Sequence, residues 1–328
     1  MPIKLLLTIL VTSTVVSGWW FFIGKNRITE NRQEGTIVQN VSLQNDFTGA
    51  KINEEDLLQG CARKDCIPSI DTPVFESAVS GDNWLQPEDR VFAIKFAGEF
   101  RAYPQRILNW HEIVNDEIDF TPIAITFCPL CGSAVAFERT VDGIITELGV
   151  SGKLHESDLV MYDRYEGNLW QQITGEAIVG PAARRDESLK QIPIITTTWE
   201  EWKTAHPDTQ VLSLSTGFTR NYDQYPYGTY EQNEELLFGV KQLDKSLPIK
   251  TVVYGVEIGE KAKAYPETAF EKRATITDTV GGTTITLTKN EGGEIEVQDS
   301  ESGESIIPIR LFWFAWAAFH PDTELYLL

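Results

Sequence analysis

The sequence predicts a β-rich α+β fold: a single large domain built from two unequal, internally repeated halves, following an N-terminal membrane-spanning segment. The chain has 328 residues, 42% of them hydrophobic and 11% aromatic, which is enough for a large core. Short runs of β-branched and aromatic residues between turn residues indicate strands. Two pairs of similar segments recur in the same order, and this recurrence indicates a repeat.

The N-terminus contains an apolar run from Leu5 to Ile23 without a charged residue. Its 19 residues are about the length that spans a bilayer. The aromatic residues Trp19 to Phe22 are typical of a membrane interface. A signal peptide cut after Val16-Ser17-Gly18 is the alternative. We therefore predict a membrane anchor or signal at residues 1–24.

The rest of the chain divides into a tether and a globular part. Residues 25–50 are polar and without periodicity, so we expect a flexible tether, and residues 51–328 form the predicted domain. A single N-terminal anchor usually exports the remainder of its chain, so we expect a membrane-anchored, extracytoplasmic domain in the periplasm or on the cell surface. The net charge of −20 disfavours nucleic acid as a partner.

The repeat rests on two pairs of segments. The pairs are residues 197–214 with 311–328, and residues 91–104 with 253–266. They place the first half near residues 88–216 and the second near 250–328. Between its matched segments the first half carries Cys and His residues, whereas the second carries none. The sequence thus predicts one active half and one supporting half.

Local signals predict individual elements within the repeat. Val91 to Phe96 reads as a strand that ends at a turn at Ala97-Gly98. Trp199 and Trp202 are three residues apart and share one face of a helix. Proline disfavours helical geometry in the residue before it, so His206 and its counterpart His320 should end helices and have a structural role.

The segment "TFCPLCGSAVAF" contains two thiols, Cys128 and Cys131, between two short apolar runs. A Cys-Pro-x-Cys-Gly turn at the tip of a hairpin is typical of metal-binding knuckles, in which both sulfurs face one ion. A redox dithiol is the alternative, but it favours a helix N-terminus, and the residues after Cys131 read as a strand. An inert structural pair is the third interpretation.

A metal site needs further ligands. We predict His111 as the third ligand, with His155 and Met161 as weaker candidates, because imidazole and thioether groups bind Zn, Cu or Fe together with thiolates. A core histidine and a packed methionine are the alternatives.

Four residues are candidates for catalysis or for support of the site, and the sequence identifies neither a substrate nor a protein partner. They are Arg101, Tyr103, Glu112 and Asp163. Cys61 and Cys66 frame a short polar loop, and in an oxidising compartment a local disulfide is the expected outcome.

Five further motifs follow one another along the chain: "DCIPSID", "FRAYPQRILNWHEIVND", "TFCPLCGSAVAFER", "GVSGKLHESDLVMYDR" and "LWQQITGEAIVGP". In this order they resemble the domain-of-unknown-function family 3179. The resemblance covers roughly residues 55–328 and implies an exported protein, but it brings no established activity. In that family glycines usually stand where Cys61 and Cys66 are, which implies an added disulfide in this chain.

Three functions are compatible with these patterns. The first is an extracytoplasmic metal-binding protein, with a redox metalloenzyme as its more specific form. The second is a thiol-disulfide protein in which Cys128 and Cys131 cycle and His111 assists. The third is a surface or assembly module that binds a partner through its Trp-rich second half.

Overall fold

The computed structural model describes residues 46–290 and 293–327. The predicted anchor at residues 1–24, and the tether up to residue 45, lie outside the described residues. Among the residues described, no helix has both the length and the apolar character needed to cross a membrane.

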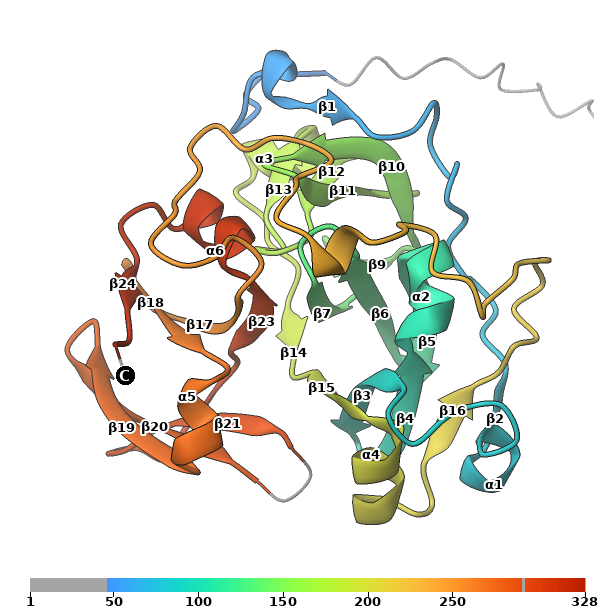
Figure 1. Ribbon diagram of the computed structural model, residues 1–328. Coiled ribbons are helices and arrows are strands. Elements are labelled where there is room, and N and C mark those ends of the chain that lie inside the picture. The colour runs from blue at the N-terminus through green and yellow to red at the C-terminus, as the bar shows by residue number, and fades with distance from the viewer. Residues whose placement is uncertain (1–45, 291–292, 328) are drawn as a thin grey trace, which may run out of the picture. The chain divides into compact units, whose positions relative to one another are not determined.

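The predicted α+β class is wrong, because the described chain is mostly β (Figure 1). Within residues 46–290 and 293–327 the longest helices have seven residues: α2 (Gln105–His111), α4 (Trp199–Ala205) and α6 (Trp313–Phe319). The shorter helical turns are α1 (Ala78–Gly81), α3 (Pro181–Arg184), α5 (Ala269–Lys272), η1 (Glu54–Asp56) and η2 (Tyr230–Gln232). The His-Pro pairs after α4 and α6 end these helices after two turns, so they contribute little helix.

One sheet of the first half has the order β15-β3-β4-β16-β2. Its strands are β15 (Ile195–Thr198), β3 (Arg90–Phe96), β4 (Glu99–Pro104), β16 (Gln210–Leu212) and β2 (Phe75–Ser77). The β3–β4 hairpin turns at Ala97 and Gly98, where φ is positive at both residues. The pair β16–β4 is parallel, whereas the other pairs are antiparallel.

A sheet of the second half has the order β23-β17-β18-β24 and the same pattern of strand directions. Its strands are β23 (Ile309–Phe312), β17 (Val252–Ile258), β18 (Lys261–Pro266) and β24 (Glu324–Leu325). The Trp202 indole donates to Thr209 Oγ1 at 2.8 Å, and the Trp316 indole donates to Thr323 Oγ1 at 2.8 Å. The internal repeat stays a prediction. If it is correct, equivalent residues of the two halves lie at matching positions in these two sheets.

The remaining strands form three further sheets and one ribbon. The first sheet contains β14 (Gln191–Ile192), β7 (Ser133–Glu138), β6 (Thr121–Cys128) and β5 (Ile113–Ile118). The second contains β1 (Leu58–Gln59), β10 (Leu148–His155), β11 (Asp158–Asp163), β12 (Leu169–Gln171) and β13 (Ala177–Val179). The third contains β19 (Thr275–Val280), β20 (Thr283–Lys289), β21 (Ile295–Asp299) and β22 (Ser305–Ile306). The ribbon pairs β8 (Thr140–Val141) with β9 (Ile144–Ile145).

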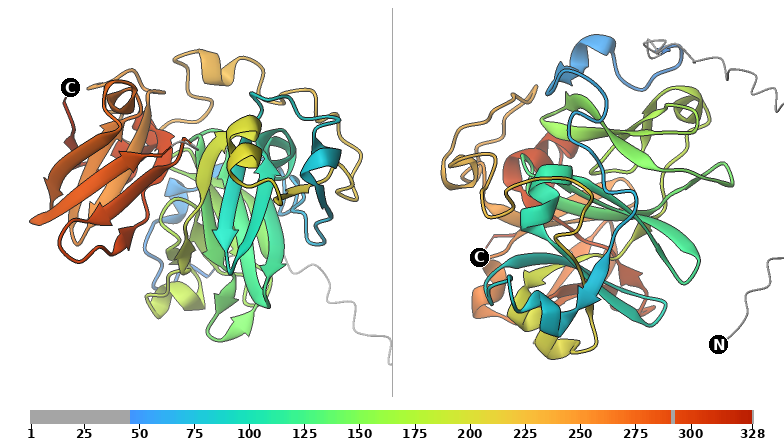
Figure 2. Two further views of the ribbon diagram at one scale, coloured as in Figure 1. Left: turned by 90° about the horizontal axis from the view of Figure 1, so that it is seen from below. Right: turned by 90° about the vertical axis from the view of Figure 1, so that its right-hand side faces the viewer.

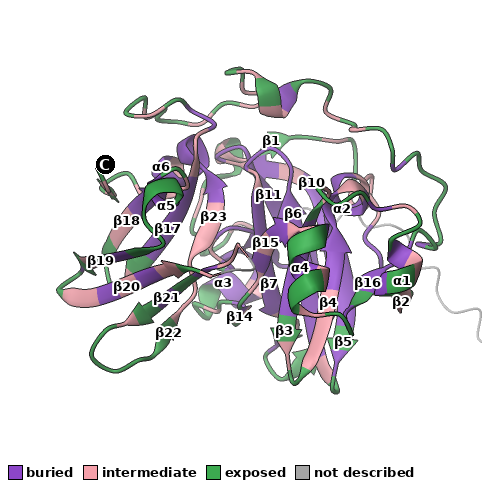
Figure 3. Ribbon diagram, turned by 60° about the horizontal axis from the view of Figure 1, so that its bottom comes forward, coloured by how far each residue is buried: buried purple, intermediate pink, exposed green. Residues whose placement is uncertain are grey.

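The largest hydrophobic cluster joins residues from both halves of the chain. It contains Cys128, Cys131 and Trp170 from the first half, and Trp313 and Trp316 from the second. Figure 2 shows the orange and red strands of the second half lying together beside the green strands of the first. Strands β6, β7 and β11 are largely buried (Figure 3). The two thiols therefore lie in the main core.

A long segment, residues 213–251, connects β16 to β17 and is called the strap here. Its only helical or strand element is η2. The strap is held to the first half by side-chain bonds: Tyr230 Oη donates to the Leu130 carbonyl at 3.0 Å, and Ser157 Oγ donates to the Phe238 carbonyl at 3.1 Å. Loops of this length with little secondary structure are uncommon in compact domains and are usually either functional or linker segments.

The predicted disulfide between Cys61 and Cys66 is confirmed. Its loop rests on β10: the backbone N–H groups of Gly60 and Cys61 both donate to the Gly152 carbonyl, at 2.9 and 3.1 Å. Gly152 has a φ of +79°, and a Cβ there would lie 2.9 Å from the Arg63 carbonyl oxygen. Only glycine allows this close approach of loop and strand.

Replacing both Cys61 and Cys66 with Ser should lower the free energy of unfolding by about 2 kcal/mol, the value expected for so short a closed loop. Urea denaturation measures the loss. Reductant should destabilise the native protein by a similar amount and leave the double variant unaffected. Equal stability of the double variant and the native protein would contradict this prediction.

Candidate metal centre

A tight hairpin places the two thiols. Strand β6 ends at Cys128, β7 begins at Ser133, and these two residues are paired. Gly132 has a φ of +63°, and a Cβ there would lie 2.9 Å from the Phe312 ring. The turn therefore needs glycine both for its backbone and for its packing. The predicted hairpin around Cys128 and Cys131 is present.

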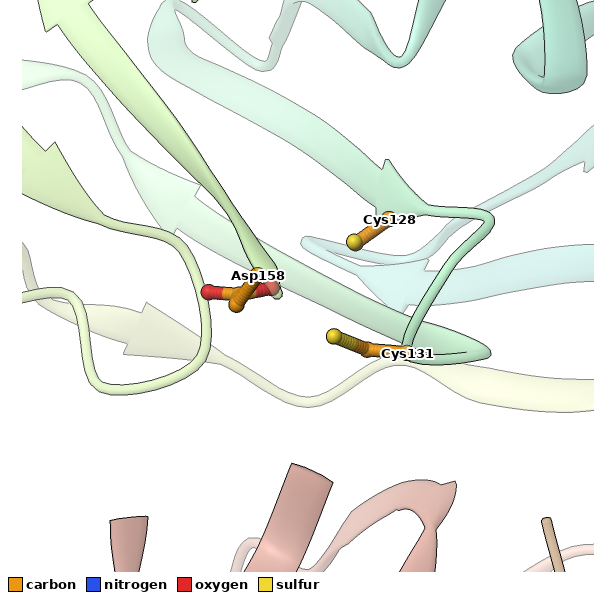
Figure 4. A group of neighbouring side chains, drawn as sticks. All are labelled: Cys128, Cys131 and Asp158. Atoms are coloured by element: carbon orange, nitrogen blue, oxygen red, sulfur yellow. The ribbon is translucent and has the colours of Figure 1, made fainter. Parts of the chain in front are cut away.

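A second hairpin brings a carboxylate to the thiols. Strands β10 and β11 are joined through Glu156 and Ser157, both with positive φ, and Asp158 is the first residue of β11. The possible ligand atoms of Cys128, Cys131 and Asp158 all lie within 4.8 Å of one another (Figure 4). Each residue is at most 1% exposed, and both cysteines are free.

The contacts of these groups leave one oxygen without a partner. Cys131 Sγ lies 3.4 Å from the Ser157 carbonyl oxygen. Asp158 Oδ2 accepts from Gln171 Nε2 at 2.6 Å and from the Ile173 backbone N–H at 3.1 Å. Asp158 Oδ1 is buried and has no hydrogen-bond partner among the described residues, and the two thiols are close enough to donate to this carboxyl when they are protonated. A buried oxygen of this kind costs free energy unless a proton or a cation reaches it.

A second buried carboxyl, that of Glu112, lies near the two thiols and Asp158. It directly follows α2 with a φ of 59°, and Tyr227 of the strap donates to its Oε1 at 3.0 Å. Burial raises the pKa of Glu112 to about 7, and the charge of Asp158 acts in the same direction. The strap thus contributes a hydrogen bond to the surroundings of the thiols.

Burial makes ionisation of these groups unfavourable. It raises the pKa of both thiols, that of Cys131 well above its usual value, and it raises the pKa of Asp158 to about 6. Among the described residues, neither Asp158 nor Glu112 forms an ion pair with a basic side chain. These acids therefore stay protonated or share a bound cation.

His111, the predicted third ligand, does not join the thiols. Its Nδ1 lies 2.7 Å from the Pro68 carbonyl oxygen, and its Nε2 lies 2.8 Å from Tyr222 Oη. Both ring nitrogens are thus engaged in the core beside α2. The adjacent residue Glu112 is instead close enough for its charge to raise the pKa of the Cys128 thiol. Asp158, and not His111, is the third residue grouped with the two thiols.

The weaker ligand candidates are also placed differently. His155 Nδ1 bonds to Gln171 Oε1 at 2.8 Å, so His155 reaches Asp158 only through the Gln171 amide. His155 also lines a cavity of about 440 Å³. Met161 is fully buried on β11, paired with Val150 and Trp170 on the neighbouring strands.

Three of the four catalytic candidates have structural contacts instead. Arg101 and Tyr103 both donate to Asp116 Oδ2, each at 2.6 Å. Asp163 accepts from three consecutive backbone N–H groups, residues 165–167, and from the side chains of Asn168 and Trp170. Only Glu112 lies next to the thiols. Sequence reasoning assigned neither Asp158 nor Tyr227 to the metal site, because no local pattern connects them to the cysteine hairpin.

In a comparison with known protein families, the model of one family matches most of the chain. The model of the family described as "Protein of unknown function (DUF3179)" matches residues 64–307. The chain belongs to this family. The match to DUF3179 includes both hairpins that form the site, as well as Glu112 and the strap. Neither a curated protein nor a solved structure matches the chain at a significant level. The DUF3179 description assigns no activity, so function is argued from the site.

Proposed function

We propose that this protein binds a transition-metal ion through Cys128, Cys131 and Asp158. One observation supports the proposal most: two free thiols and a carboxylate with an unpartnered oxygen converge in the core within 4.8 Å. A bound divalent cation would offset two of the three negative charges of these groups. It would also provide the partner that Asp158 Oδ1 lacks.

The donor set favours zinc. Two thiolates and one carboxylate are ligands that Zn²⁺ accepts, and thiolates disfavour Mg²⁺ and Ca²⁺. Metal binding would release the thiol protons, so affinity should rise with pH. Three protein ligands leave a fourth position, which a water molecule would occupy in a site this buried. Glu112, with a pKa of about 7, is the carboxyl that could exchange a proton there.

The other two functions have less support. Reactive dithiols have lowered pKa values, whereas burial raises the pKa of Cys128 and Cys131. A partner-binding surface built from tryptophans is also disfavoured, since Trp313 and Trp316 are at most 2% exposed.

Elemental analysis of the purified protein tests the metal site. We expect about one zinc ion per chain in the native protein. Cys128→Ser, Cys131→Ser and Asp158→Asn should each lower the metal content at least tenfold, because each removes one ligand. Circular dichroism shows whether each variant is folded.

Two matched controls separate ligand loss from general damage. Replacing Cys61 and Cys66 with Ser removes two sulfurs outside the site and should leave the metal content unchanged. Asp116→Asn changes a buried carboxyl that bonds to Arg101 and should also leave it unchanged. A native protein that is folded and metal-free after purification in zinc-containing buffer would overturn the proposal.

We also infer an extracytoplasmic location for the domain. The Cys61–Cys66 disulfide supports it, because disulfides persist in oxidising compartments. Membrane attachment through residues 1–24 is part of the same proposal and rests on the apolar run in the sequence.

A further inference from the structure

A chain of hydrogen bonds links Asp158 of the metal centre to the edge of a cavity. Gln171, the last residue of β12, donates from Nε2 to Asp158 Oδ2 at 2.6 Å. Its Oε1 lies 2.8 Å from Nδ1 of His155, the last residue of β10. Gln171 is 1% exposed, whereas His155 is half-buried and lines the cavity of about 440 Å³. Three strands thus contribute one side chain each to a chain that begins at a proposed metal ligand.

The pairing of β10, β11 and β12 brings these side chains together. His155 pairs with Asp158 across the β10–β11 hairpin. Gln171 pairs with Val160, which follows Asp158 by two residues on β11. Residues that are directly paired, or two apart on one strand, point to the same face of a sheet. The three side chains therefore share one face of this sheet, which explains their contact.

The contacts of Asp158 determine the direction of each hydrogen bond. As a metal ligand Asp158 is ionised and can only accept, so the Gln171 atom that faces it is the amide nitrogen. The Ile173 backbone N–H donates to the same oxygen at 3.1 Å, in agreement with its role as an acceptor. The amide oxygen of Gln171 consequently faces His155 and can only accept. His155 Nδ1 therefore carries a hydrogen, and the ring donates this bond.

The same contacts leave one carboxylate oxygen for a metal ion. Asp158 Oδ2 accepts two hydrogen bonds, whereas no N–H or O–H group of the described residues bonds to Oδ1. An ion would therefore bind through Oδ1 alone. Without the Gln171 bond, the carboxylate would lose one of the two contacts that fix its orientation. Hydrogen-bond partners of metal ligands commonly affect metal affinity by about 10- to 100-fold.

We propose that His155 and Gln171 are positioning residues of the metal centre, which hold Asp158 so that Oδ1 is presented to the ion. Gln171 contacts the ligand directly, and His155 acts through Gln171 by keeping its amide in one orientation. The His155 ring is itself held by an edge contact with Phe319 of α6, with ring centroids 5.9 Å apart. This inference rests on the proposed metal binding and adds two residues that are not ligands.

Zinc affinity of the purified protein, measured by competition with a chelator of known affinity, tests the proposal. Gln171→Met keeps the length of the side chain but removes the amide, and should weaken zinc binding by about 10- to 100-fold. His155→Phe keeps a ring but removes the donor, and should weaken binding about tenfold. His155→Asn keeps a nitrogen donor near the position of Nδ1, so its affinity should stay within about threefold of the native value.

The visible absorption of Co²⁺, bound in place of zinc, is a readout that lost packing alone would not change. If Asp158 turns when His155 loses its donor, the ligand field of Co²⁺ changes with it. The absorption bands of His155→Phe should therefore shift, and those of His155→Asn should match the native protein. His206→Phe is the matched control, the same substitution at a histidine that stacks on Phe100 after α4, and it should leave zinc affinity unchanged.

Circular dichroism shows whether each variant is folded, and His155→Leu replaces His155→Phe if the latter does not fold. The proposal is overturned if folded His155→Phe and Gln171→Met bind zinc as tightly as the native protein. It is also overturned if His155→Asn is weakened as much as His155→Phe, because the donor would then not matter. Both outcomes leave the metal site in place. A native protein that binds neither Zn²⁺ nor Co²⁺ would overturn the metal site and this inference together.

Discussion

Replacing Trp316 with Ala should lower the free energy of unfolding by about 3 to 5 kcal/mol, the range for a fully buried large side chain. Trp316 is 1% exposed in the largest hydrophobic cluster. Its ring lies directly on the backbone of β17, because a Cβ at Gly255 would come within 2.2 Å of it. The surrounding backbone limits how far the cavity can collapse. Guanidinium denaturation measures the loss.

Two comparisons make this experiment specific. Tyr165→Ala removes an aromatic side chain that is 56% exposed and should change stability by less than about 0.5 kcal/mol. Trp202→Ala should cost as much as Trp316→Ala if the two halves are a true repeat. A loss below about 1 kcal/mol for Trp316→Ala would contradict the packing described here.

The metal-free protein should lose stability as pH rises, and Glu112→Gln should remove much of this loss. In the unfolded chain Glu112 ionises near its ordinary pKa of 4.5, whereas in the folded protein its pKa is about 7. Between these values the folded state keeps a proton that the unfolded state has lost. The contribution of Glu112 is therefore complete below about pH 4 and falls by roughly 3 kcal/mol up to about pH 8.

Urea denaturation in the presence of a chelator, at pH 5 and at pH 8, measures this dependence. Glu112→Gln should flatten the pH profile, because the amide carries no charge in either state. Glu117→Gln, at an exposed glutamate of β5, should leave the profile unchanged. Identical profiles for native protein and Glu112→Gln would show that the Glu112 carboxyl ionises alike in both states.

Local signals in the sequence predicted the local structure. The Cys-Pro-Leu-Cys-Gly turn between apolar runs gave the β6–β7 hairpin, because glycine and short strands determine such a turn at close range. The His-Pro pairs that follow α4 and α6 likewise marked helix ends. The disulfide between Cys61 and Cys66 followed from short spacing.

Which residues form the site depends on packing between segments that are far apart in the sequence, and local patterns do not predict it. His111 and Glu112 are neighbours, but His111 bonds to Pro68 and Tyr222, whereas Glu112, with a φ of 59°, bonds to Tyr227 of the strap. Asp158 reaches the cysteines because two hairpins from different sheets meet in the core. The fold class was wrong for a related reason. The tryptophan pairs predicted helices, and α4 and α6 are present, but each has only seven residues, and sheets form the rest of the core.

The strap has a consequence for how fast a metal ion could exchange. Cys128, Cys131 and Asp158 are at most 1% exposed, and Tyr227 and Tyr230 fasten the strap near them. A chelator in solution cannot touch an ion in such a place until part of the strap detaches. As the chelator concentration rises, the rate of metal extraction should therefore level off at the rate at which the chain opens locally. The residence time of a bound ion would thus measure how often the strap opens. Slow loss of the ion would not by itself show a high affinity.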